Sequence, residues 1–124
     1  MKNKLNQKGQ AVVTLLFFMV IGISIVTAVV VVVLNTAVSG SNFEQGTVAY
    51  YSAETGAENA LIRLIRDPSY GGETMVVDGA TVTVQVSGNT INSTAEYGKS
   101  IRRIEVQTVY NNNVLSVLSW REIN

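Results

Sequence analysis

The sequence predicts an α+β fold in which a long N-terminal α-helix packs against a small C-terminal antiparallel β-sheet. Three observations predict this fold. Residues 9–43 carry no charge, residues 47–66 place apolar side chains at a helical period, and apolar residues alternate with polar ones from Glu73 onward. We therefore divide the chain into four parts: a basic leader (1–9), a transmembrane helix (10–38), an amphipathic continuation of that helix (39–67) and a β-sheet head (68–124).

The uncharged run is long enough to cross a membrane as a helix. Its segment Ala11–Leu34 is almost wholly apolar and has about 24 residues, whereas roughly 20 helical residues span the hydrocarbon core of a bilayer. The hydroxyls of Thr14, Ser24 and Thr27 can bond back to helix carbonyls. The β-branched run Val29–Val33 favours a strand, but a lone strand in lipid would leave its backbone groups unpaired, so we expect a helix throughout.

Charge and composition restrict the function classes. Lys2, Lys4 and Lys8 precede the apolar run, which predicts a cytoplasmic N-terminus and export of everything after Leu34. Subtracting these three from the nine Lys and Arg residues leaves six basic side chains against nine acidic ones, so no specific nucleic-acid binding is expected. Cysteine and histidine are absent, which excludes disulfides, thiolate metal sites and the commonest general base.

A helical period returns between the apolar run and the sheet. Asn35–Gly46 is small and polar, and Gly40 and Gly46 are expected to bend or fray the helix there. Pro68 is expected to end the helix, because the residue before a proline is pushed away from helical angles. From Thr47 onward the expected apolar stripe consists of Val48, Tyr51, Ala53, Ala57, Ala60, Leu61, Leu64 and Ile65.

The remaining residues predict four or five antiparallel strands in a meander. Val82, Val84 and Val86 share one face of the second strand, which we expect to cover the helical stripe. Trp120 is expected to fill the core between sheet and helix. The expected strands are 74–77, 80–87, 90–97, 101–110 and 114–120, separated by turns at Asp78-Gly79, Gly88-Asn89, Gly98-Lys99 and Asn111–Asn113.

A basic leader ending in Lys8-Gly9, a long uncharged helix directly after it, an amphipathic extension and a small antiparallel sheet together resemble the type IV pilin and pseudopilin family. Residues 49–61, Ala-Tyr-Tyr-Ser-Ala-Glu-Thr-Gly-Ala-Glu-Asn-Ala-Leu, are more specifically similar to the stretch after the membrane helix in PilX-type minor pilins. The resemblance covers residues 8–66 and is architectural beyond them. It implies cleavage by a prepilin peptidase after Gly9, with Gln10 as the first mature residue and a candidate for N-methylation.

Two positions depart from the family pattern. The family usually has phenylalanine at the first mature position and glutamate at the fifth, where this chain has Gln10 and Thr14. In major pilins that carboxylate is thought to neutralise the N-terminal ammonium of a neighbouring subunit, which Thr14 cannot do. The family's mid-helix proline is also missing, since Pro68 is the only proline. Thr14 therefore favours a minor, priming or tip subunit over a major one.

The resemblance implies a filament subunit that is first inserted as a prepilin in the inner membrane of a bacterium, with a single span and a cytoplasmic N-terminus. Helix bundling then assembles it into an extracytoplasmic filament of a type IV pilus or a type II secretion-like system. The implied partners are other pilin subunits, prepilin peptidase, the pilus assembly platform and membrane lipid. Helix contact would favour the small residues Gly22, Ser24 and Ala28, which allow close approach.

Charged residues predict one further contact. Glu54 and Glu58 lie four residues apart on one helical face, and could meet Arg102 and Arg103 of the sheet or of a neighbouring subunit. No metal or other cofactor is expected, because no histidine or third carboxylate accompanies the glutamates. No enzyme is expected, since no serine or threonine can be matched with a histidine base. The alternative to a filament subunit is a static single-pass membrane protein with a small extracytoplasmic binding domain, which would retain the leader.

Overall fold

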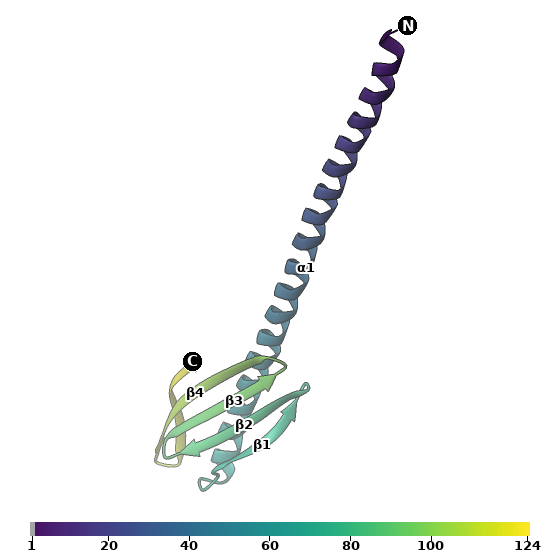
Figure 1. Ribbon diagram of the computed structural model, residues 1–124. Helices are drawn as coiled ribbons and strands as arrows, with labels where there is room; N and C mark the ends of the chain where they lie inside the picture. The colour runs from purple at the N-terminus through teal and green to yellow at the C-terminus, as the bar shows by residue number, and fades with distance from the viewer. Residues whose placement is uncertain (1) are drawn as a thin grey trace. The chain divides into compact units, whose positions relative to one another are not determined.

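The computed structural model describes residues 2–124, with side chains from residue 7 onward, and in this range the chain forms one α-helix and five β-strands (Figure 1). The predicted α+β class is confirmed, because the helix packs against an antiparallel sheet. The chain divides after Gly40 into an N-terminal unit and a head unit that begins at Ser41, and the two are described in turn. The elements are α1 (Lys2–Arg66), β1 (Gly72–Val77), β2 (Ala80–Ser87), β3 (Thr90–Tyr97), β4 (Ser100–Asn111) and β5 (Val114–Ile123).

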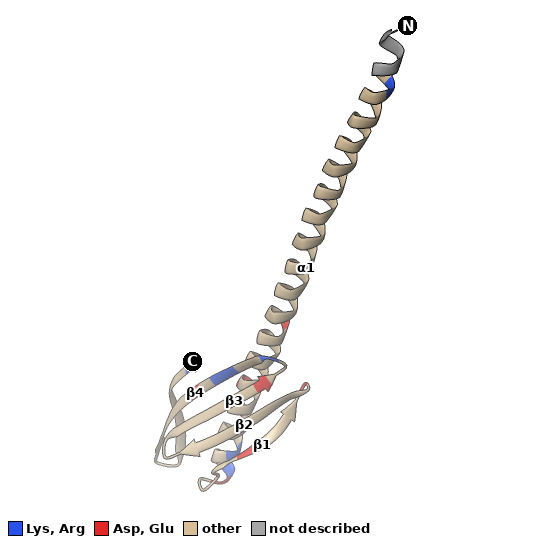
Figure 2. Ribbon diagram, viewed as in Figure 1, with Lys and Arg blue, Asp and Glu red and all other residues tan. Residues whose placement is uncertain are grey.

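The N-terminal unit is the first part of α1. It stays helical through Val29–Val33, because helical hydrogen bonds pair the backbone groups that a lone strand would leave free. The hydroxyls of Thr14, Ser24 and Thr27 donate to carbonyls four residues earlier, at 2.9, 2.8 and 2.8 Å, as predicted. Figure 2 shows this part of α1 free of charged residues over most of its length. Every side chain of residues 7–40 is exposed, so its apolar surface is uncovered.

The head unit contains the sheet, whose strands follow in the order β1-β2-β3-β4-β5, each antiparallel to the next. Two-residue turns join the strands at the predicted places. Both turn residues have positive φ at Asp78-Gly79 (48° and 81°) and at Asn112-Asn113 (51° and 61°), which is the backbone of a type I′ hairpin turn. Short turns of this kind make consecutive strands neighbours, and the meander follows.

Strands β2 and β3 have the predicted bounds, whereas β1, β4 and β5 are longer than predicted. β1 begins at Gly72, which pairs with Gln85 and has a φ of 123° that only glycine adopts readily. β5 continues to Ile123, which pairs with Arg103. These extra strand residues are set by hydrogen bonding to the neighbouring strand and not by alternation of polar and apolar residues. The alternation in the sequence therefore predicted strands that were too short.

The core lies between the sheet and residues 46–64 of α1. The buried helical residues are mostly small: Gly46, Ala49, Ser52, Ala53, Gly56, Ala57, Ala60 and Leu64. On the sheet side the core cluster contains Val82, Val84, Ile91, Ala95, Ile104 and Val106. Trp120 packs against this cluster, as predicted. A stripe of small residues lets the sheet approach the helix backbone closely, at the dense packing of protein interiors.

Part of the predicted helical stripe was wrong. Four of its eight members are buried, but Tyr51 and Ile65 are 60% and 63% exposed. The buried stripe contains Gly46 and Gly56 in place of larger residues, because the sheet lies too close to the helix for larger side chains. A Cβ added to Gly56 would lie 2.5 Å from both Ser93 Oγ and Val82 Cγ1, closer than non-bonded atoms approach.

The predicted fraying over Asn35–Gly46 was also wrong, since these residues are helical throughout. Gly46 is a packing residue, because a Cβ there would lie 3.2 Å from Nη2 of Arg102. The helix ends at Arg66, as Pro68 predicted. Directly after it, the hydroxyl and backbone N–H of Ser69 donate to Asp67 and lower the pKa of that carboxyl, which fixes the turn into the sheet.

Gly56→Ala is expected to destabilise the head unit. Overpacking a core costs about 1–3 kcal/mol, and the short distances to Ser93 and Val82 put this site at the upper end, so a net loss of about 1–2 kcal/mol remains after the gain in helix propensity. Denaturant unfolding of the full chain in detergent, followed by Trp120 fluorescence, measures the loss. Gly40→Ala is the control, because nothing lies within 4 Å of a Cβ there. Equal stability of the two variants would contradict the packing role of Gly56.

Candidate functional site

The N-terminal part of α1 is the first candidate site, because its chemistry is unusual for a protein surface. Within the described range, one helix near the N-terminus is long and apolar enough to span a membrane, and none of its most apolar segment is buried. Between residues 12 and 38 its large apolar side chains range from 42% exposed at Ile21 to 68% exposed at Phe17. So much contiguous apolar surface requires lipid or another protein to cover it.

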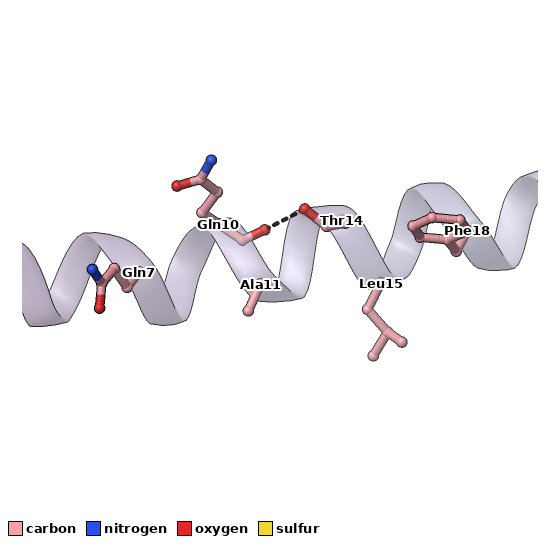
Figure 3. Close-up of a pocket in the computed structure, with 6 residues that line it drawn as sticks. All are labelled: Gln7, Gln10, Ala11, Thr14, Leu15 and Phe18. Atoms are coloured by element: carbon pink, nitrogen blue, oxygen red, sulfur yellow. Dashed lines mark hydrogen bonds between the residues drawn. The ribbon is translucent and has the colours of Figure 1, made fainter.

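Two of the residues predicted for processing and assembly, Gln10 and Thr14, lie near the N-terminal end of this helix. Figure 3 shows Gln10 and Thr14 on one strip of α1. The Thr14 hydroxyl donates to the Gln10 carbonyl at 2.9 Å, so it is already engaged. The strip borders a shallow hollow of about 470 Å³, and because all its residues belong to one helix, only a second molecule could close it. Its residues are Gln7, Gln10, Ala11, Thr14, Leu15 and Phe18.

The glycines of this region are not required by the fold of the single chain. Nothing lies within 4 Å of a Cβ built on Gly9 or Gly22, and both residues are helical. Glycine in a helix interior is less stable than alanine by about 1 kcal/mol. Ser24 and Ala28 are exposed on the same helix, and the Ser24 hydroxyl donates to the Val20 carbonyl. The small residues predicted for assembly therefore have no packing role within the described chain.

The predicted pairing of Glu54 and Glu58 with Arg102 and Arg103 is not made within the chain. Arg102 pairs instead with Glu122 at 2.7 Å, and Arg103 donates from Nε to the Thr94 hydroxyl. Among the described side chains, neither glutamate forms an ion pair. Arg102 and Glu122 lie on the same face of two neighbouring strands, β4 and β5. Their separation in the sequence does not predict that they meet. Pairing of these glutamates with a neighbouring subunit stays a prediction.

Sequence reasoning missed a cluster around Glu73 that fastens β1 to the last turns of α1. The Glu73 carboxylate accepts hydrogen bonds from Asn59 and Tyr70, each at 3.0 Å, and pairs with Arg63 at 2.8 Å. The Arg63 guanidinium also lies over the Tyr70 ring, 5.6 Å from its centroid. No spacing rule could have found this cluster, because the turn at Pro68 decides which residues meet.

The outer face of the sheet carries a polar hollow of about 510 Å³. Its side chains can donate to and accept from a polar ligand, and Asn92 Oδ1 is enclosed there without a hydrogen-bond partner in the described chain. Glu105, on its border, is held by Arg121 of β5. Within the described range there is no group of acidic side chains that could hold a metal ion. The hollow is lined by Thr83, Gln85, Asn92, Thr94, Glu96, Arg103, Glu105 and Ile123.

The end of the β4–β5 hairpin is a further uncovered apolar surface. The last pair between β3 and β4 joins Thr90 to Gln107, so β4 and β5 continue beyond it as a two-stranded ribbon. Such a ribbon is marginally stable alone. Its exposed apolar residues are Tyr110, Val114, Val117 and Leu118. The opposite part of the ribbon is covered, because Leu115 packs against the core cluster.

No family model, curated protein or solved structure matches this chain. The chain is thus defined by its own features, namely a membrane-length uncovered helix and an α+β head unit.

The Glu73 cluster is expected to lose stability at alkaline pH. Burial, the hydrogen bond to Glu73 and the charge of Glu73 raise the pKa of Tyr70 from 10.0 to about 12. The folded state therefore favours the neutral phenol of Tyr70. The contribution of this phenol to the free energy of unfolding is complete below pH 10 and is lost as the pH rises to 12. Tyr70→Phe should be less stable by about 1 kcal/mol below pH 10, since it lacks one hydrogen bond.

Unfolding of the full chain as a function of pH measures this effect. The difference between the original chain and Tyr70→Phe should shrink between pH 10 and pH 12. Tyr110→Phe, at an exposed tyrosine, controls for the general effect of removing a phenol. A difference that stays constant through this pH range would refute the role of the Tyr70 proton.

Proposed function

We propose that this protein is a subunit of a type IV pilus or a type II secretion-like filament, in a minor, priming or tip position. The observation that carries the proposal is the uncovered apolar helix, whose most apolar segment is wholly unburied although a folded head unit follows it. A bilayer first covers this helix. Other filament subunits cover it afterwards, with about 25 cal/mol at stake for each Å² of apolar surface.

Processing at the N-terminus follows from Lys8-Gly9. Three lysines within the first eight residues keep this end cytoplasmic, where a prepilin peptidase would cleave after Gly9. No atom of the described chain lies within 4 Å of a Cβ built on Gly9, so packing in this range does not require a glycine there, and a glycine weakens the helix. Recognition by a peptidase that needs a small residue at the cleavage site accounts for a glycine there.

Thr14 supports a special position in the filament. A fully buried ammonium without a partner costs several kcal/mol even after relaxation. The Thr14 hydroxyl is neutral and is engaged with the Gln10 carbonyl, so it offers no compensating charge to a neighbour. A subunit at the tip of the filament, or one that starts it, lacks a neighbour on one side. It therefore does not have to provide a carboxylate for the N-terminal ammonium of that neighbour.

The polar hollow on the outer face of the sheet favours a second candidate, a static single-pass membrane protein that binds a polar ligand there. The two candidates differ in processing. Mass spectrometry of the native protein separates them: a chain that begins at Gln10 supports the filament subunit, whereas a chain that retains residues 1–9 would refute it.

Gly9→Val is expected to abolish cleavage without unfolding the protein. A branched side chain at this position blocks a peptidase that accepts only a small residue, while the surroundings of Gly9 have room for it. The intact mass of the membrane-bound chain should then include the leader. Gly40→Val, a matched change at another open helical glycine, should be cleaved normally. Cleavage of Gly9→Val at the original rate would contradict the proposed site.

Gly22→Leu is expected to reduce assembly while leaving membrane insertion intact. Leucine favours the hydrocarbon core more than glycine does, but its bulk prevents the close helix approach that a small residue allows. The amount in sheared filaments should fall about tenfold relative to the amount in membranes, since loss of one close contact of about 1.4 kcal/mol is a tenfold change. Val20→Leu is the control, and an equal effect of both changes would contradict a specific contact at Gly22.

A further inference from the structure

The charge of the mature N-terminus has no partner in the apolar part of the chain. The first acidic residue in the sequence is Glu44, so residues 10–43 offer no carboxylate. If cleavage occurs after Gly9, which is part of the proposed function, the new end at Gln10 is an ammonium at the start of a wholly uncharged helix. An ammonium that enters an apolar bundle without a partner is strongly unfavourable.

Gln10 itself carries the group that can remove this charge. Its side chain is exposed, and Figure 3 shows its carboxamide directed away from Thr14. Only the backbone carbonyl of Gln10 is engaged by the Thr14 hydroxyl. Within the described part of the chain the carboxamide makes no hydrogen bond, so no intramolecular contact holds it away from its own α-nitrogen.

We propose that Gln10 becomes pyroglutamate after cleavage. The neutral α-nitrogen attacks Cδ of the side-chain carboxamide and forms a new C–N bond. The bond from Cδ to Nε2 then breaks, and Nε2 leaves as ammonia after taking a proton from the attacking nitrogen. The product is a lactam, with no oxidant, reductant or second substrate consumed. The step turns the terminal ammonium into a neutral amide.

The helix can accept this ring. The lactam fixes the backbone at residue 10 much as a proline would, and proline is favoured at the first helical position. The first N–H groups of a helix have no partner within it, so no helical hydrogen bond is lost. The Gln10 carbonyl is not part of the ring and can still accept from the Thr14 hydroxyl.

Cyclisation explains why Gln10 and Thr14 occur together. Thr14 lies one helical turn from Gln10 in the same chain, and a neutral first residue needs no carboxylate there, so a hydroxyl at position 14 becomes acceptable. It also excludes N-methylation, because the α-nitrogen becomes an amide and is no longer a basic amine. The two modifications of Gln10 are therefore alternatives on any one chain.

Mass spectrometry of the native protein tests the proposal. Membranes and sheared filaments are first treated with isotopically heavy reagents that dimethylate free amines, so that an uncyclised end cannot cyclise during digestion. We expect an N-terminal peptide that begins at residue 10, is lighter than the free form by one ammonia and carries no label at its α-nitrogen. A labelled or natively methylated Gln10 would overturn cyclisation but leave the proposed cleavage intact. A chain that keeps residues 1–9 would overturn both.

Two variants test the consequence of the ring. Gln10→Asn keeps a carboxamide but is one methylene too short to close a stable lactam, so it should retain the ammonium and appear in filaments at least about a hundredfold less than the original chain. Adding Thr14→Glu should restore it to filaments, because a carboxylate can then pair with the ammonium. Gln107→Asn, the same change at an exposed residue of β4, is the control and should assemble normally. Full assembly of Gln10→Asn alone would overturn the proposal.

Discussion

The structure depends on one constraint: the apolar surface of an uncharged helix must be covered by other molecules. Residues 9–43 contain no charge, and the most apolar segment of α1 is unburied in the chain itself. A helix satisfies its own backbone in any solvent, so lipid and the side chains of other helices can cover it equally well. In the proposed function, that interchangeability allows a membrane-inserted chain to become a filament subunit. In the same proposal, the basic residues before the run keep the N-terminal end inside the cell.

The head unit depends on a different property of the same helix. From Gly46 to Ala60 its buried face consists of glycine, alanine and serine, and the sheet lies against this face with almost no room for another atom. The Glu73 cluster then fastens the end of α1 to β1 through one carboxylate. Small residues in the head unit thus serve packing within the chain. Within the described chain nothing lies within 4 Å of a Cβ built on Gly9 or Gly22, so these two glycines have no such packing role.

Periodicity was sufficient to predict the fold class, the bounds of β2 and β3, and the turns such as Asp78-Gly79. It could not predict the exposure of Tyr51, because a helical period records polarity and not the distance at which a sheet approaches. Nor could it find the pair of Arg102 with Glu122, since the bulge after Gln107 shifts the register of β5 against β4. At the candidate site, the residues and their chemistry can be read from the sequence. Only the structure shows that no atom of the described chain lies within 4 Å of a Cβ built on Gly9 or Gly22.

The central claim is that the apolar helix is an interface between filament subunits that is first kept in lipid. A photo-crosslinking amino acid in place of Ala28, an exposed small residue of this helix, tests the claim most directly. In sheared filaments the account predicts adducts that join this chain to the N-terminal helix of another subunit, and in membranes it predicts adducts to lipid. Lipid adducts alone, with no protein adduct in any fraction, would contradict it.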